Sequence, residues 1–100
     1  MRIRLAPQAR TDLDDIWFYI ARESGSIPIA TRLIHSITGK FTLLAQHPFI
    51  GRSLESNQRP SVRAFTAGNY LIFYSPRLEE LRILRVIHSS RDAFAVFAQE

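Results

Sequence analysis

Residues Asn69-Tyr70-Leu71-Ile72-Phe73-Tyr74-Ser75 carry aromatic and β-branched side chains on both faces, a composition typical of a β-strand. Strand-like runs flank this stretch at residues 61–66 and 80–88. The turn sequences Ala67-Gly68 and Ser75-Pro76-Arg77 separate the three runs. Short strands joined by such turns predict an antiparallel β-meander in the C-terminal half of the chain.

Two amphipathic helices are predicted upstream of this meander. The first follows Pro7, which suits the first turn of a helix, and ends near Gly25. The second starts near Pro28 and ends at His47 at the latest, because a residue before proline avoids the α region. Apolar residues recur at helical spacing on one face of each helix: Leu13, Ile16, Trp17 and Ile20, then Ala30, Leu33, Ile34, Ile37, Phe41 and Leu44. The short link between them predicts an antiparallel helical hairpin.

The remaining segments complete the expected fold. Arg2-Ile3-Arg4-Leu5 alternates polar and apolar residues and predicts a short strand, whereas residues 49–60 show no periodicity. A tail helix is expected at residues 91–98, with Ser90 as its N-cap. The order β-α-α-β-β-β-(α) predicts one α+β domain over residues 1–100, with the hairpin packed on a mostly antiparallel four-stranded sheet.

Composition restricts the classes of function. The chain has 100 residues, a net charge of +4 and no cysteine, which excludes disulfides, zinc ribbons and thiol nucleophiles. Twelve of its 13 basic residues are arginine, the cation better suited to protein interfaces and phosphate contacts. No apolar run long enough to span a membrane and no signal peptide is present, so we expect a cytoplasmic protein without cofactor.

Three arginines interrupt apolar strand sequences. If side chains alternate, Arg63 shares a face with Phe65, and Arg85 shares a face with Ile83 and Ile87. Arg82 also lies among the apolar residues of the last strand. A charge in such surroundings needs an acidic partner, because an unpaired buried charge is costly. Two interpretations stay open: ordinary surface charges, or a cluster that receives a carboxylate or phosphate from another molecule.

Other groups give weaker indications. Phe18 and Tyr19 lie off the apolar stripe of the first helix and suit a partner surface. Asp12, Asp14 and Asp15 are interpreted as a solvated helix face rather than as a catalytic pair. The three histidines, His35, His47 and His88, show no metal-ligand spacing, so we expect no metal site. His88 and the residues after it lack the G-x-S-x-G turn of a hydrolase and favour a structural corner.

Taken in order, several segments resemble the ParE toxins of the RelE/ParE superfamily, which belong to bacterial type II toxin–antitoxin systems. The matching segments are Leu5-Ala6-Pro7-Gln8-Ala9, Asp12-Leu13-Asp14-Asp15-Ile16-Trp17-Phe18-Tyr19-Ile20, His47-Pro48-Phe49-Ile50-Gly51-Arg52, Val62-Arg63-Ala64-Phe65, Asn69-Tyr70-Leu71-Ile72-Phe73-Tyr74, Ile83-Leu84-Arg85-Val86-Ile87-His88 and Ser90-Arg91-Asp92. The resemblance implies a RelE-like fold, a ParD-like antitoxin as partner and DNA gyrase as the target. It also implies inhibition by protein contact rather than by catalysis.

The partner-binding residues expected for such a toxin are aromatic and basic: Phe18, Tyr19, Arg63, Arg82, Arg85, Arg91 and Phe94. The chain shows no motif for direct sequence-specific binding of nucleic acid.

RelE-type relatives instead cut mRNA on the ribosome, which is the alternative function. In this chain Arg63, Arg85 and His88 could supply a minimal catalytic set. The sequence departs from the nuclease pattern, because no lysine lies in the region that supplies the nuclease's basic residues. Phe94 and Phe97 follow the last strand in place of a tyrosine, and a phenyl ring cannot transfer a proton.

Overall fold

The computed structural model describes residues 1–54 and 61–98 of the chain. The elements are β1 (Arg2–Leu5), α1 (Pro7–Ser24), α2 (Ile27–Gln46), β2 (Arg52–Ser53), β3 (Arg63–Ala67), β4 (Tyr70–Pro76), β5 (Glu80–His88) and α3 (Ala93–Ala98). The strands form one sheet in the order β1-β5-β4-β3-β2, in which the β1–β5 pair is parallel and the other three pairs are antiparallel. The predicted α+β fold with a helical hairpin on a mostly antiparallel sheet is therefore confirmed.

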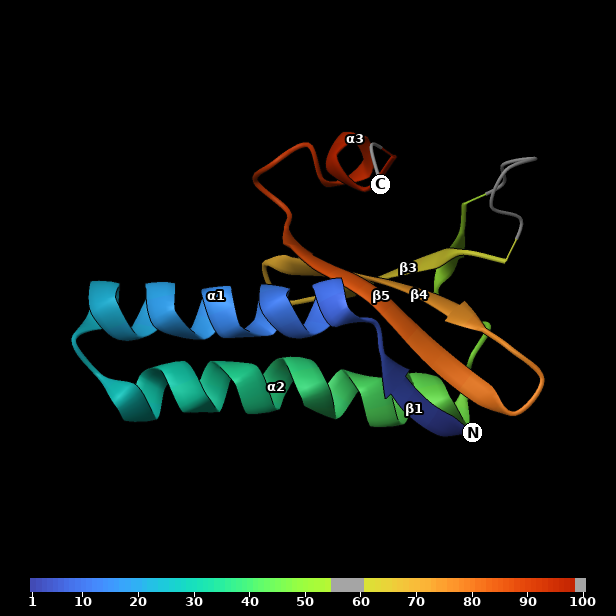
Figure 1. The fold of residues 1–100 in the computed structure, drawn as a ribbon, viewed down its shortest axis with the longest axis horizontal. Helices are drawn as coiled ribbons and strands as arrows, with labels where there is room; N and C mark the ends of the chain where they lie inside the picture. The colour runs from blue at the N-terminus through green and yellow to red at the C-terminus, as the bar shows by residue number, and fades with distance from the viewer. Residues whose placement is uncertain (55–60, 99–100) are drawn as a thin grey trace.

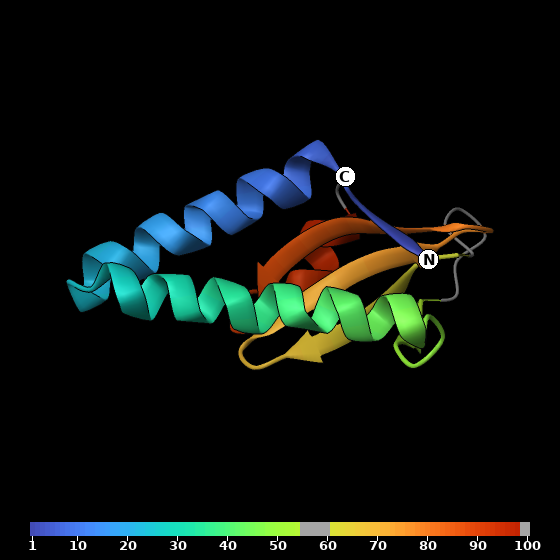
Figure 2. The ribbon, with the colours of Figure 1, turned by 90° about the horizontal axis from the view of Figure 1, so that it is seen from below.

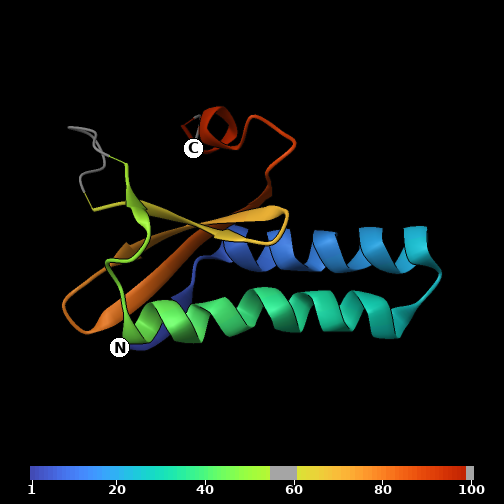
Figure 3. The same ribbon diagram turned by 180° about the vertical axis from the view of Figure 1, so that it is seen from behind.

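The molecule has three layers, with the sheet in the middle. The α1–α2 hairpin covers one face and α3 covers the other (Figures 1 and 3). Ile37 and Phe41 of α2 pack on the hairpin side with Ile72, whereas Phe73 packs on the other side with Phe97 of α3. The link between α1 and α2 extends past the end of the sheet (Figure 2), so part of the hairpin has no strand beneath it.

Residues at the helix ends explain where each helix of the hairpin begins and stops. Pro7 occupies the first turn of α1, and Gly25 ends this helix with a φ of 66°, a conformation that favours glycine. The Ser26 side chain caps α2 by accepting a hydrogen bond from the Ile29 N–H at 3.2 Å. His47 is the C-cap of α2, directly before Pro48, as predicted. None of the helices in the described residues is long and apolar enough to cross a membrane.

The prediction of four strands is wrong, because the described residues form a sheet of five strands. The additional strand, β2, pairs with β3 through Arg52 opposite Ala64 and Ser53 opposite Arg63. It lies in the segment that was expected to be irregular, of which residues 55–60 lie outside the described part. Two residues are too few to produce an alternating pattern, so the sequence gives no indication of this strand.

The tail helix also starts later than predicted, at Ala93. Asp92 caps it, since its carboxylate accepts a hydrogen bond from the Ala95 N–H at 3.3 Å. Ser90 is therefore not the N-cap; its own N–H donates to the His88 ring instead. The stretch between β5 and α3 is a turn, and it places Ser90 and Arg91 beside the end of β5.

An irregularity in β5 changes which residues share a face. Phe73 pairs with Arg85 while the next residue of β4, Tyr74, pairs with Ile83, so Leu84 is an extra residue in β5. Ile83 consequently packs on the hairpin side of the sheet and Ile87 on the α3 side. The expectation that Arg85 shares one face with both isoleucines is wrong, because strict alternation stops at this bulge.

Candidate partner-binding site

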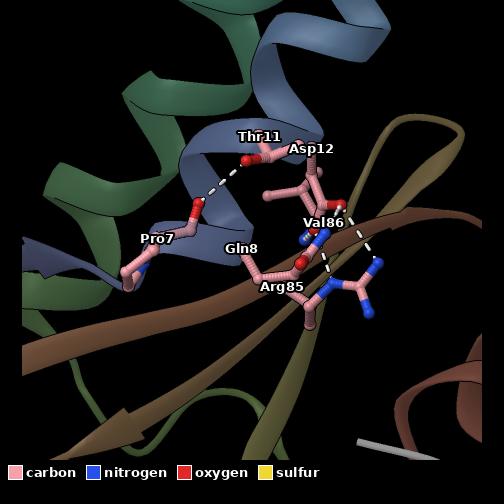
Figure 4. Close-up of polar contacts among 6 residues, drawn as sticks. All are labelled: Pro7, Gln8, Thr11, Asp12, Arg85 and Val86. Atoms are coloured by element: carbon pink, nitrogen blue, oxygen red, sulfur yellow. Dashed lines mark hydrogen bonds and ion pairs between the residues drawn. The ribbon is translucent and has the colours of Figure 1, made fainter.

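A buried ion pair joins α1 to β5. The Arg85 guanidinium donates from Nε to Asp12 Oδ2 at 2.7 Å and from Nη2 to Asp12 Oδ1 at 3.0 Å (Figure 4). The Val86 N–H also donates to Asp12 Oδ2, at 2.9 Å. Asp12 and Arg85 are 8% and 9% exposed, so the interpretation of Asp12 as a solvated residue is wrong. The carboxylate that Arg85 requires comes from this chain.

The topology explains why a carboxylate is needed at this place. β1 runs along β5 only as far as Leu5 opposite Ile83, and its last hydrogen bond to β5 is from the Ala6 N–H to the Ile83 carbonyl, at 2.8 Å. Beyond this hydrogen bond, β1 no longer pairs with β5. The Asp12 carboxylate therefore accepts the hydrogen bond of the Val86 N–H, which the backbone of a longer β1 would have accepted. The sequence does not show this pairing, because Asp12 and Arg85 are 73 residues apart.

Directly beside this ion pair lies a cleft of about 500 Å³ between α1 and the end of β5. Asp15 and Tyr19 line it from α1, on the same helix face as Asp12 because they are three to four residues apart. Tyr70 at the start of β4 and His88 at the end of β5 line it from the sheet. The complete lining is Asp12, Asp15, Ile16, Tyr19, Tyr70, Val86, Ile87, His88, Ser90 and Arg91.

The aromatic side chains of the cleft are positioned by contacts with one another. The Tyr70 and His88 rings meet edge to face, with centroids 5.0 Å apart. The Ser90 N–H donates to His88 Nδ1 at 3.0 Å, which fixes the orientation of the imidazole. Burial, and to a smaller extent the neighbouring Tyr19, raises the pKa of the Tyr70 hydroxyl above its usual value of 10.0. Tyr70 is therefore neutral, with its O–H proton in place, at physiological pH.

Arg63 lies away from the cleft, as the first residue of β3. Its guanidinium donates to the carbonyls of Phe49 and Gly51, at 3.2 and 2.8 Å, and lies 5.0 Å from the Phe49 ring centroid. The buried Tyr74 hydroxyl holds the same turn, donating to the Pro48 carbonyl at 2.8 Å and accepting from the Gly51 N–H at 2.9 Å. Hydrogen bonds of the Arg63 and Tyr74 side chains thus fix the turn at residues 48–51.

Arg82 belongs to a surface ion cluster on β5. Glu80 contacts both Arg82, at 3.1 Å, and Arg4 of the neighbouring strand, at 3.4 Å. Partial burial of Glu80 acts to raise the pKa of its carboxyl group, but the hydrogen bonds from Arg82 and Arg4 outweigh this effect and lower the pKa below its usual 4.5. Arg82 keeps 41% of its side chain exposed, so it remains accessible to a partner.

The aromatic residues expected at a partner surface are exposed. Phe18 is 67% and Tyr19 is 55% exposed on α1. Phe94 on α3 is partly exposed; its ring packs edge to face against Phe73, and the Arg52 guanidinium lies 4.9 Å from its centroid. Arg52 was not among the predicted residues, because the two-residue strand that carries it has no sequence pattern.

The structure brings Tyr19, His88 and Arg91 together in the cleft. It does not bring together Arg63, Arg85 and His88, the set required by the nuclease alternative. Arg63 lies opposite Tyr74 and His88 lies opposite Tyr70. Tyr70 and Tyr74 are four residues apart on β4, which corresponds to roughly 13 Å along the strand. Within residues 1–54 and 61–98, no three His, Asp or Glu side chains are grouped so that they could hold a metal ion.

Comparison with known proteins gives the family. The family described as "ParE toxin of type II toxin-antitoxin system, parDE" matches residues 3–93. The chain belongs to the ParE toxin family. The cleft, the buried ion pair and the fixed turn all lie within the matched region.

Two curated relatives come from Caulobacter vibrioides (strain ATCC 19089 / CIP 103742 / CB 15). Toxin ParE1 is 32% identical over 92 residues, which is 92% of this chain and 93% of that protein. Toxin RelE3 is 31% identical over 87 residues, which is 87% of this chain and 92% of that protein. Both relatives are therefore aligned over nearly their whole length, as expected for members of the RelE/ParE superfamily.

Solved structures agree on the fold. A chain of the chromosomal ParDE system from P. aeruginosa matches with a TM-score of 0.75 at 23% identity, covering 88% of this chain and 95% of that one. A chain of the RelBE2 toxin–antitoxin complex from Mycobacterium tuberculosis matches with a TM-score of 0.59 at 22% identity, covering 87% and 95%. This ParE-family chain thus has the fold shared by ParDE and RelBE toxins.

Proposed function

We propose that this chain inhibits DNA gyrase by protein contact and that a ParD-like antitoxin neutralises it. The observation that carries the proposal is the match of residues 3–93 to the ParE toxin family. The structural relative from P. aeruginosa belongs to a ParDE system, which supports a ParD-like protein as the partner. A target in DNA metabolism also implies that the toxin acts in the bacterial cytoplasm.

The proposed contacts combine aromatic side chains with basic ones. Phe18 and Tyr19 are exposed on α1, and Arg91 lines the cleft together with Tyr19. Arg82 and Phe94 complete the set of direct contacts. An acidic, partly apolar antitoxin segment would complement these residues and a chain of net charge +4, giving fast association.

Two residues of the predicted set support this surface from inside the fold. Arg85 is bonded to Asp12 and holds α1 against β5, on one side of the cleft. Arg63 holds the turn that carries Phe49 and Ile50. In the proposed function both are therefore positioning residues, and substitution of either would alter the surface without removing a direct contact.

The geometry favours contact over catalysis. Ribonuclease action requires a group that takes up or releases a proton beside cations that stabilise the phosphate charge. Arg63 and His88 lie toward opposite ends of the sheet, and the Arg85 guanidinium is bound to Asp12. A set of these three residues would have to be rearranged before it could act on one phosphodiester.

A supercoiling assay tests the proposal. Purified toxin added to DNA gyrase and relaxed plasmid is expected to block supercoiling, and the product of the neighbouring antitoxin gene is expected to restore it. The same preparation is added to ribosomes translating an mRNA as the comparison. Cleavage of that mRNA with full gyrase activity would reject the proposal in favour of the RelE-type nuclease.

A further inference from the structure

The hydroxyl group of Tyr70 has no hydrogen-bond partner among the described residues. The residue is 6% exposed, yet its Oη forms no hydrogen bond within the described part of the chain. Every fully buried side-chain nitrogen or oxygen in that part has a partner, so the Tyr70 hydroxyl must be accessible. Tyr70 lines the cleft, and the hydroxyl is therefore a polar group that the cleft offers to a ligand.

The groups near this hydroxyl are mostly hydrogen-bond donors. Tyr70 retains its proton, because its pKa is raised by burial. The His88 Nδ1 accepts from the Ser90 N–H, which places the proton of the neutral ring on Nε2. Arg91 adds a guanidinium that has no ion pair with a described carboxylate, and Tyr19 adds a second phenol.

The acceptors of the cleft are fewer. The Asp12 carboxylate already accepts two hydrogen bonds from Arg85 and one from the Val86 N–H, so its charge is compensated. Asp15 is the other carboxylate among the lining residues. Ile16 and Val86 form the apolar part of the cleft wall. A ligand that suits this arrangement has an apolar stem and ends in a carboxylate.

We propose that the cleft between α1 and the end of β5 binds one carboxylate of the antitoxin, with Tyr70, His88 and Arg91 as its hydrogen-bond donors. This inference rests on the proposed function, because the antitoxin supplies the carboxylate. The carboxylate belongs either to a Glu or Asp side chain or to the antitoxin's own C-terminus. Both sources present the same two oxygens to the same donors.

Binding measurements on two conservative variants test the proposal. Tyr70→Phe removes only the hydroxyl, and Arg91→Gln replaces the charged guanidinium with a neutral, shorter polar group. Each is expected to weaken binding of the purified antitoxin about tenfold, the usual effect of losing one hydrogen bond to a charged group. Tyr70→Phe is expected to leave the melting temperature unchanged, because this hydroxyl has no bond within the described fold. Arg77→Gln, in the exposed β4–β5 turn, serves as the matched control and is expected to bind like wild type.

The outcomes are distinguishable. No binding of the antitoxin to the wild-type chain would reject the proposed function itself. Normal wild-type binding with unchanged affinity of both Tyr70→Phe and Arg91→Gln would overturn the carboxylate site alone. Loss of affinity for an RNA oligonucleotide in these variants, with antitoxin binding intact, would also overturn it and would assign the cleft to phosphate.

Changes on the antitoxin side identify the source of the carboxylate. Each Glu and Asp of its toxin-binding segment is changed to the amide, and a further form carries an amidated C-terminus. One of these forms is expected to bind wild-type toxin about tenfold more weakly and to show no further loss with Tyr70→Phe. Additive losses in every combination would contradict a direct contact between Tyr70 and an antitoxin carboxylate.

Discussion

Arg82 and Arg85 lie three residues apart on the same strand, and both contact a carboxylate. Arg85 and Asp12 keep about a tenth of their side-chain surface exposed (11% and 9%), and their closest atoms are 2.7 Å apart. Arg82 keeps 41% exposed and contacts Glu80 at 3.1 Å. Water can replace the partner of Arg82 but not that of Arg85, so the same type of ion pair has very different consequences in the two places.

The largest expected effect is at the buried pair. Asp12→Ala leaves the Arg85 charge without its carboxylate and removes the acceptor of the Val86 N–H, so we expect a loss of about 3–5 kcal/mol in the free energy of unfolding. Urea unfolding measures it. Asp14→Ala, on the exposed side of the same helix, is the control and is expected to change stability by less than about 0.5 kcal/mol. Equal losses in the two variants would show that the buried Arg85–Asp12 pair contributes no more to stability than an exposed charge does.

A smaller effect is expected at the turn that Arg63 holds. A Cβ atom on Gly51 would lie 2.4 Å from the Tyr74 hydroxyl oxygen and 2.9 Å from the Ala64 carbonyl oxygen. Gly51→Ala must therefore displace the turn, and we expect it to cost about 1–3 kcal/mol. Gly39→Ala in α2 is the control, since nothing lies within 4 Å of its Cβ position, and it should stabilise the helix by about 0.5–1 kcal/mol. A neutral Gly51→Ala would show that this turn is not held as the contacts indicate.

The smallest effect is expected at the surface cluster, and it depends on pH. Arg82 and Arg4 lower the pKa of Glu80, so the ionised form is favoured in the folded state. The contribution to stability is therefore present above the usual Glu pKa of 4.5 and is lost as the pH falls through the lowered value. Glu80→Gln should remove this part of the acid dependence and should destabilise the protein less than Asp12→Ala at neutral pH. Urea unfolding above and below pH 4.5 measures both, and an unchanged acid dependence would contradict the assignment.

The helical hairpin could be predicted because its determinants are local. Pro7, Gly25 and Pro48 mark helix ends through backbone geometry that depends only on neighbouring residues. The meander strands were found for the same reason, through composition and turn residues. These local features also carried the family resemblance, which the match to residues 3–93 confirms.

The features that were missed all depend on contacts between distant segments. Asp12 appears solvated in the helix pattern, and only the end of the β1–β5 pairing explains why its carboxylate is buried. The extra residue Leu84 changes the face of the residues after it, and no local pattern announces a bulge. The cleft likewise joins residues of α1 with Tyr70 and with residues after position 85. Its partner role stays a prediction for the binding measurements to test.

The parallel pairing of β1 with β5 has a consequence for how the toxin is made. The residues of β1 are synthesised long before their partner residues, Glu80 to Ile83. Local contacts let the helical hairpin form first, whereas closing the loop between β1 and β5 costs on the order of 4 kcal/mol in chain entropy. We expect the nascent toxin to complete its sheet only after Glu80 to Ile83 have left the ribosome, so that the proposed antitoxin, if already present, meets the toxin as it becomes folded.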